Sequence, residues 1–227
     1  MGILTTIEEV NMYFDKLPLD QKLGVGHIAI ENSRRSAPIM ERIIPYKYDE
    51  TRLQEGEEII TRIETFTLQW KSAKAQKLLA TQELKTVSKE VKTTYRNTRR
   101  IAFMLFKDQE PRRRALAMDG WSKRALSQWL EEARQFYTNA LADPEVPHQF
   151  STFGITAKRL NEEKNLLAKV EKAMANQEKK AAEAMEITRL RKLAVKELDR
   201  WMSRFFTILR LALGKSQWLE AVGIVVK

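Results

Sequence analysis

The sequence predicts an all-α protein, an elongated helical bundle built from two related long helices plus shorter helices. Only 8 Gly and 6 Pro occur among 227 residues, too few turn-forming residues for a sandwich or barrel of many short strands. Two stretches of roughly 57 residues lack an internal proline and keep apolar side chains at helical spacing. Hydrophobic residues make up 43% of the chain, which is enough to build a folded core.

Breaks in the helical pattern set the order of the elements. Apolar residues recur at helical spacing in five segments, which we expect to be helices: 5–17, 19–44, 49–107, 122–141 and 156–213. Pro18 ends the first segment, and Gly24, Gly26 and Pro38 should kink or break the second. Each long segment would span about 85 Å as a straight helix, more than the diameter of a compact globule of this size. An elongated fold follows from that length.

The second long helix has recognisable signals at both ends. Pro144, Pro147 and Gly154 before it predict the longest loop of the chain. Thr156 is a suitable N-cap, and Gly214 is a suitable C-terminal stop. The short apolar tail beyond Gly214 needs cover from the rest of the protein.

The two long segments are related by a shift of 107 residues without a gap. Arg52-Leu53 aligns with Arg159-Leu160, and further matches are Ile59-Ile60 with Leu166-Leu167, Lys89-Glu90 with Lys196-Glu197, and Ile101 with Ile208. We interpret this as an internal duplication, although helices rich in Lys, Glu and Leu also match by chance. We expect the resulting segments to form one folded domain: an N-terminal helical segment (1–47), a first repeat unit (48–120), a connecting helix and loop (121–155) and a second repeat unit (156–227).

Several helix-end motifs point to relatives. In chain order they are Tyr48 to Gly56, Met118-Asp119-Gly120, Trp129-Leu130 with Phe136-Tyr137, Phe153 to Thr156, Leu198 to Trp201, and Leu219 to Ile224. Over residues 48–226 the chain resembles a group of bacterial all-helical proteins of unassigned function. The resemblance implies a tandem helical bundle and brings no catalytic or ligand-binding residue with it. The first 47 residues fit it poorly.

The composition removes most catalytic and metal chemistries. The chain has no cysteine, which excludes disulfides, thiolate nucleophiles and Cys-ligated zinc. Neither His27 nor His148 has the Glu-x-x-His spacing of a di-metal bundle, and Gly24-x-Gly26 lacks the third glycine of a dinucleotide loop. Three carboxylate pairs remain, which we expect at helix starts or beside polar helix positions: Glu57/Glu58, Glu131/Glu132 and Glu162/Glu163. We therefore expect no catalytic residue, no metal and no cofactor.

The formal net charge of +10 contains a one-sided basic stripe on the first long helix. At 100° per residue, eight cations fall within about 100° of one another and form a predicted polyanion-binding ridge: Lys71, Lys74, Lys85, Lys89, Lys92, Arg96, Arg99 and Arg100. A face of one charge sign can follow a phosphate backbone. The alternatives are a solvated face, or a seam paired with acidic residues of a neighbouring helix. The stripe has no interleaved aromatic residues for base stacking.

These observations favour a non-enzymatic structural or protein-interaction bundle with coiled-coil character that self-associates. The alternative is a binder of nucleic acid or another polyanion through the basic ridge. An enzyme that uses buried carboxylates is a third possibility, because a sequence does not reveal which carboxylates are buried. No window approaches eighteen consecutive apolar residues and the N-terminus lacks a secretory pattern, so we expect a cytoplasmic protein without a transmembrane segment.

Overall fold

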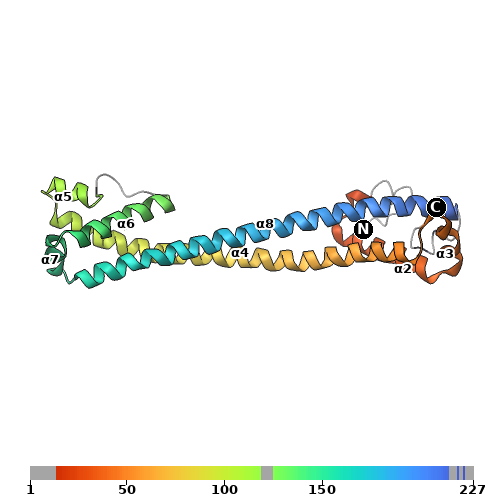
Figure 1. Ribbon diagram of the computed structural model, residues 1–227, viewed down its shortest axis with the longest axis horizontal. Helices are drawn as coiled ribbons and strands as arrows, with labels where there is room; N and C mark the ends of the chain where they lie inside the picture. The colour runs from red at the N-terminus through yellow and green to blue at the C-terminus, as the bar shows by residue number, and fades with distance from the viewer. Residues whose placement is uncertain (1–13, 119–124, 215–218, 220–221, 223–227) are drawn as a thin grey trace. The chain divides into compact units, whose positions relative to one another are not determined.

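The computed structural model describes residues 14–118, 125–214, 219 and 222, and every regular element in that part of the chain is helical (Figure 1). The elements are η1 (Phe14–Lys16), α2 (Leu19–Arg35), α3 (Ala37–Ile43), η2 (Ile44–Tyr46), α4 (Glu50–Leu105), α5 (Glu110–Ala115), α6 (Leu126–Ala142), α7 (Glu145–Ser151) and α8 (Ala157–Leu213). The predicted all-α class is confirmed, as are two long helices of 56 and 57 residues.

The start of α4 and both ends of α8 lie at residues that the sequence signals, and α4 ends at Leu105, two residues before the predicted end. Asp49 Oδ1 accepts a hydrogen bond from the Arg52 backbone N–H (3.0 Å), and Thr156 Oγ1 accepts one from the Arg159 N–H (3.3 Å). Each side chain thereby satisfies a backbone donor that lacks a partner within its helix. Gly214 ends α8 with φ at +63°, the left-handed conformation that glycine adopts without strain. The predicted cap at Thr156 and the stop at Gly214 are both confirmed.

Glycine does not break the second predicted segment. α2 continues through Gly24 and Gly26, and the break falls at Ser36, with Pro38 in the first turn of α3. A Cβ on Gly26 would lie 2.9 Å from Ile60 Cδ1, so this glycine allows α2 to lie close against α4. The segment is broken as predicted, by its proline.

Two other predicted segments differ from the structure at their ends. The segment before α8 was predicted as a loop but contains the short helix α7. Pro147 is tolerated there because it lies in the first turn of α7, where a backbone N–H would have no hydrogen-bond acceptor within the helix. The described end of predicted helix 5–17 is the short 3-10 turn η1, and the rest lies outside the described residues. The predicted start of the helix at 122 also lies outside them, and α6 is described from Leu126.

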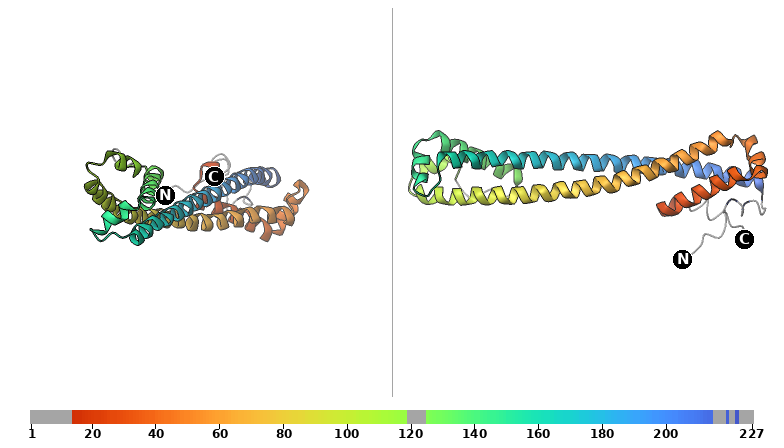
Figure 2. Two further views of the ribbon diagram at one scale, coloured as in Figure 1. Left: turned by 60° about the vertical axis from the view of Figure 1, so that its left-hand side comes forward. Right: turned by 90° about the horizontal axis from the view of Figure 1, so that it is seen from below.

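Contacts between residues divide the chain into two compact units. Unit 1 comprises residues 1–74 and 183–227, and unit 2 comprises residues 75–182. This division runs across the segments drawn from the sequence. In each unit, part of α4 packs against a part of α8 that is distant in sequence (Figures 1 and 2).

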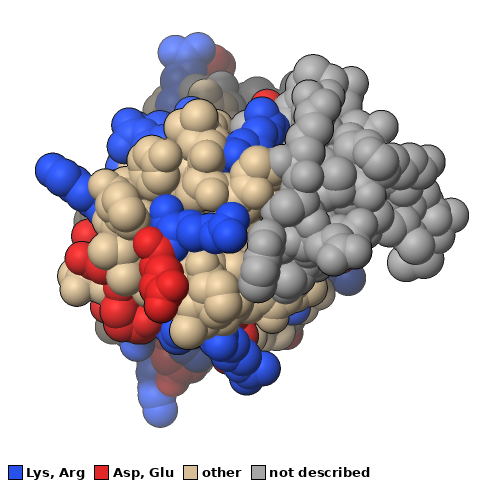
Figure 3. Space-filling view, turned by 90° about the vertical axis from the view of Figure 1, so that its right-hand side faces the viewer, with Lys and Arg blue, Asp and Glu red and all other residues tan. Residues whose placement is uncertain are grey.

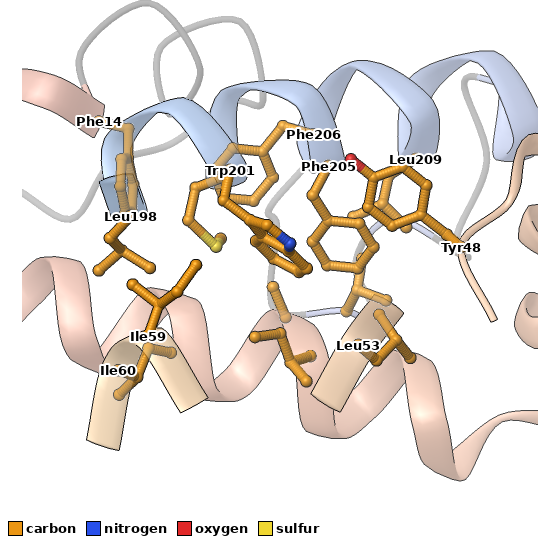
Figure 4. Close-up of a cluster of buried hydrophobic side chains, with 14 of the residues drawn as sticks. Phe14, Tyr48, Leu53, Ile59, Ile60, Leu198, Trp201, Phe205, Phe206 and Leu209 are labelled. Atoms are coloured by element: carbon orange, nitrogen blue, oxygen red, sulfur yellow. The ribbon is translucent and has the colours of Figure 1, made fainter. Parts of the chain in front are cut away.

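Unit 1 packs α2 and α3 against residues 50–74 of α4 and 183–213 of α8. Lys22 Nζ in α2 donates to Asp199 Oδ1 in α8 (2.6 Å). Figure 3 looks onto the end of this unit at which α3 lies and shows Lys and Arg side chains among and around uncharged residues. Inside the unit, Tyr48 stacks on Phe205 with ring centroids 5.2 Å apart, and Trp201 meets the Tyr48 ring edge-on at 5.9 Å (Figure 4). Aromatic side chains of α8 thus fill much of this core.

Unit 2 packs α5, α6 and α7 against residues 75–105 of α4 and 157–182 of α8. The predicted broad apolar face of α6 is confirmed, with these residues buried: Trp129, Leu130, Ala133, Phe136, Tyr137 and Ala140. Tyr95 of α4 lies among them, with its ring centroid 5.6 Å from Phe136 and 6.0 Å from Tyr137. Each unit therefore has an aromatic core of its own.

The buried positions of the two long helices follow the shift of 107 residues. Leu53 and Leu160 are both buried, and further buried pairs are Ile60 with Leu167, Ile63 with Val170, and Val91 with Leu198. Two amphipathic helices that pair along their length share such spacing without common ancestry, so duplication stays a prediction. Along the described helices, no stretch is both long enough and apolar enough to cross a membrane.

Candidate interaction surfaces

The eight cations of the predicted ridge all lie on α4 but are divided between the units. Lys71 and Lys74 belong to unit 1, and the other six belong to unit 2. Lys74 Nζ and the Arg191 guanidinium each lie 4.5 Å from the centroid of the Trp70 ring. Lys74 is therefore engaged in a cation–π contact within unit 1, whereas the exposed Lys71 forms no ion pair with a described residue.

Two of the six ridge cations in unit 2 are partly buried and contact other residues of that unit. Lys92 Nζ lies 5.4 Å from the centroid of the Trp129 ring. Burial lowers the pKa of Lys92, repulsion from Arg96 lowers it further, and attraction to Glu132 opposes both. Arg99 Nε lies 3.5 Å from Glu132 Oε1, and Arg99 Nη2 donates to the Met118 carbonyl (3.3 Å). Lys92 and Arg99 thus serve the packing of α4 against α6.

The remaining four cations form what we call the outer ridge: Lys85, Lys89, Arg96 and Arg100. All four are exposed, and their side chains make no hydrogen bond or ion pair with any described residue. They lie within residues 85–100 of one helix, which span about 22 Å. Unit 2 has 21 Lys and Arg against 13 Asp and Glu, so it holds +8 of the net charge of +10. The outer ridge therefore lies on the more basic unit.

Two of the carboxylate pairs contribute a member to the packing of unit 2: Glu163 is buried, and Glu132 is partly buried. Glu163 is only 5% exposed, and its Oε2 accepts hydrogen bonds from Thr98 Oγ1 (2.6 Å) and Tyr137 OH (3.0 Å). Its Oε1 accepts from Arg159 Nε (3.1 Å). Glu132 Oε1 accepts from Tyr95 OH (2.8 Å).

The expectation that two of the carboxylate pairs, Glu57/Glu58 and Glu162/Glu163, lie in the first turns of helices is wrong. α4 begins at Glu50 and α8 at Ala157, so Glu57 and Glu163 lie beyond the first turn of their helices. Glu57 instead pairs with Arg34 of α2 (2.8 Å). The sequence did carry a signal for Glu163: it takes the place of an apolar residue in the 3-4 spacing of Leu160, Leu167 and Val170.

These carboxylates have the character of a structural polar core. Burial and the neighbouring carboxylates raise the pKa values of Tyr95 and Tyr137 well above the ordinary tyrosine value, so both phenols stay protonated and donate. The Glu163 carboxylate accepts hydrogen bonds from three protein donors, as expected of a buried carboxylate that holds neighbouring helices in one arrangement. Among the described residues, no three His, Asp or Glu side chains are grouped so as to hold a metal ion.

Two adjoining hollows lie on the surface of unit 1, and neither was foreseen from the sequence. The first has a volume of about 350 Å³ and contains two internal ion pairs, Arg52 with Glu55 and Arg62 with Glu197, each at 2.5 Å. The second has a volume of about 530 Å³ and is lined by Tyr46, Lys47, Tyr48, Arg52, Ser203, Arg204, Thr207 and Ile208. Arg52 and Arg204 line both hollows.

No protein-family model, curated protein or solved structure matches this chain. The resemblance based on the helix-end motifs therefore stays a prediction.

Proposed function

We propose that the chain is a non-enzymatic helical bundle that binds an extended polyanion, nucleic acid being the principal candidate, through the outer ridge of unit 2. The observation that carries this proposal is the absence of any ion pair between Lys85, Lys89, Arg96 or Arg100 and a described residue. Cations that neutralise phosphates release condensed counterions, and that release drives association without base-specific contacts.

The outer ridge differs from several arginines of the same unit. Arg112 lies 3.0 Å from Asp143, Arg134 is paired with Glu131 and Glu171, and Arg159 lies 3.1 Å from Glu163. Those guanidinium groups are already neutralised within the protein. The ridge cations have no ionic partner among the described residues, so a phosphate backbone can approach them without breaking an ion pair of that part of the chain.

A charge-neutralised ridge tests the proposal against a control of equal charge. The ridge variant replaces Lys85, Lys89, Arg96 and Arg100 with Gln. The control variant replaces four exposed lysines of α8 in the same unit with Gln: Lys158, Lys169, Lys172 and Lys179. Fluorescence anisotropy with a labelled duplex then gives the slope of log K against log salt concentration.

If each ridge cation contacts one phosphate, the ridge variant should lose about 3 to 4 from the magnitude of that slope. The control variant should retain most of it, because its lysines lie on the other long helix. Equal losses in the two variants would indicate attraction to net charge alone and would refute a ridge-specific site. Absence of binding by the unaltered protein at low salt would refute polyanion binding altogether.

Self-association with a second copy, which the sequence favours, is the second candidate function. Leu78 and Leu79 of α4 are 59% and 64% exposed, and a second copy could cover them. We rank it below polyanion binding because isolated exposed leucines are common on monomers. Analytical ultracentrifugation over a hundredfold range of concentration decides it: concentration-dependent dimers that Leu78→Lys abolishes would support it, and a monomer throughout would remove it.

A further inference from the structure

The two hollows of unit 1 differ in whether their lining cations are paired with carboxylates. In the first, Arg52 and Arg62 each contact a carboxylate. The residues that line the second include no Asp or Glu. Of its three cations, Arg52 is neutralised by Glu55, whereas the exposed side chains of Lys47 and Arg204 contact no described carboxylate or hydrogen-bond acceptor. The second hollow thus has two cations that remain available to a ligand.

The other walls of the second hollow are largely aromatic and aliphatic. Tyr46 is 45% exposed, and Ile208 packs against the hydrophobic core from a partly buried position. Tyr48 is held in place by its stacking on Phe205. A ligand therefore meets firm apolar surfaces beside the cations, which is the usual composition of small-molecule sites.

The backbone fixes the position of Lys47. Its φ is +63°, a left-handed conformation in which glycine or asparagine is more usual. The Lys47 N–H donates to the Ile44 carbonyl (2.8 Å), and the Tyr48 N–H donates to the Ile43 carbonyl (3.3 Å). These bonds close the end of η2 and hold a lysine at the hollow where glycine would be less strained.

We infer that the second hollow binds a small organic anion. Its carboxylate or phosphate would be held by Lys47 and Arg204, and its apolar or aromatic body would lie against Tyr46 and Ile208. The volume of about 530 Å³ lies within the range of small-molecule sites. This site belongs to unit 1, so it is separate from the outer ridge and stands or falls independently of polyanion binding.

Phenyl phosphate is a suitable probe because it combines a phosphate with an aromatic ring. The full chain with ¹³C-labelled isoleucine methyl groups is titrated with it, and the Ile208 signal reports on the hollow. Saturable shifts of that signal are expected with a Kd of about 1 mM, as for a ligand of this size. Ile101 and Ile155 of unit 2 serve as internal reference signals that should not move.

Three variants test the assigned roles. Arg204→Gln and Lys47→Gly should each weaken binding about tenfold, the usual effect of losing one charge-assisted hydrogen bond. Lys47→Gly also suits the left-handed backbone, so lost binding in this variant would not be due to unfolding. Arg200→Gln is the matched control, because Arg200 lies one turn before Arg204 on α8 and lines only the first hollow.

Three results would overturn the inference. The first is the absence of a saturable shift at Ile208. The second is equal weakening by Arg204→Gln and Arg200→Gln, which would indicate general attraction to a basic surface. The third is inorganic phosphate binding as tightly as phenyl phosphate, which would show that the apolar walls take no part.

Discussion

Three glycines in unit 1 provide a graded test of how closely its helices pack. Gly24 and Gly26 lie within α2 and Gly56 lies within α4, so each pays the same helix-propensity cost relative to alanine. A Cβ on Gly24 would meet nothing within 4 Å, whereas one on Gly26 would lie 2.9 Å from the end of the Ile60 side chain. On Gly56 it would lie 2.6 Å from two ring atoms of Trp201 and 2.9 Å from Ile30 Cδ1.

The expected change in unfolding free energy follows from these distances. Gly24→Ala should stabilise the protein by about 0.5–1 kcal/mol, because it restricts the unfolded chain and causes no clash. Gly26→Ala should be close to neutral, because a methyl group at the end of a side chain can move aside. Gly56→Ala gains the same propensity but forces a rigid indole to shift, which costs about 1–3 kcal/mol and leaves a net loss.

Thermal and urea unfolding followed by circular dichroism measure the series. For a chain of this size, 1 kcal/mol corresponds to about 2–4 °C in the midpoint temperature. The midpoints should decrease from Gly24→Ala through Gly26→Ala to Gly56→Ala. A Gly56→Ala protein as stable as Gly24→Ala would refute the close approach of Trp201 to α4.

Two predictions concern the buried polar core of unit 2. Thr98→Val removes one donor from Glu163 and should cost about 1–3 kcal/mol in urea unfolding, whereas Thr93→Val, an exposed control on the same helix, should stay within about 0.5 kcal/mol of the original. The raised pKa values of Tyr95 and Tyr137 mean that above about pH 10 the unfolded chain loses protons that the folded protein keeps. These two tyrosines should therefore not change the stability below about pH 10 and should lower it above that pH, by up to about 1.4 kcal/mol per pH unit for each tyrosine. Urea unfolding between about pH 9 and 11.5 checks this, because Tyr137→Phe should flatten the decline and an unchanged slope would contradict the assignment.

Local sequence signals predicted the long helices well because backbone chemistry decides where a helix ends. Thr156 and Gly214 act within a single turn of chain, so their roles can be inferred without a tertiary structure. Pro147 was misleading because proline ends a helix only when it lies beyond the first turn. Gly26 was misleading for a different reason. Its lack of a side chain allows α2 to lie close to Ile60 of α4, and the sequence alone does not show that contact.

The candidate sites were less accessible to sequence reasoning because they depend on which helices meet. Helical spacing placed Lys85 and Lys92 on one stripe. Their environments differ because α6 packs beside only one of them: Lys85 is exposed, and Lys92 lies over the Trp129 ring of α6. The second hollow of unit 1 combines Lys47 with Arg204, more than 150 positions apart in the chain. No local pattern links residues at such a distance.

The division of the chain into units has a consequence for synthesis on the ribosome. Unit 2 is one continuous stretch, 75–182, and all of it has been made before residues 183–227 are translated. Unit 1 combines residues 1–74 with residues 183–227. Leu53 and Ile60 can therefore be buried only after Trp201 and Phe205, which belong to the same core, have been synthesised. Domains complete in sequence are free to fold first, and long sequence separations slow the closure of the others. Unit 2 should thus fold while the nascent chain is still growing, and the apolar residues of unit 1 that precede it should stay exposed to solvent until their partners in α8 have been made.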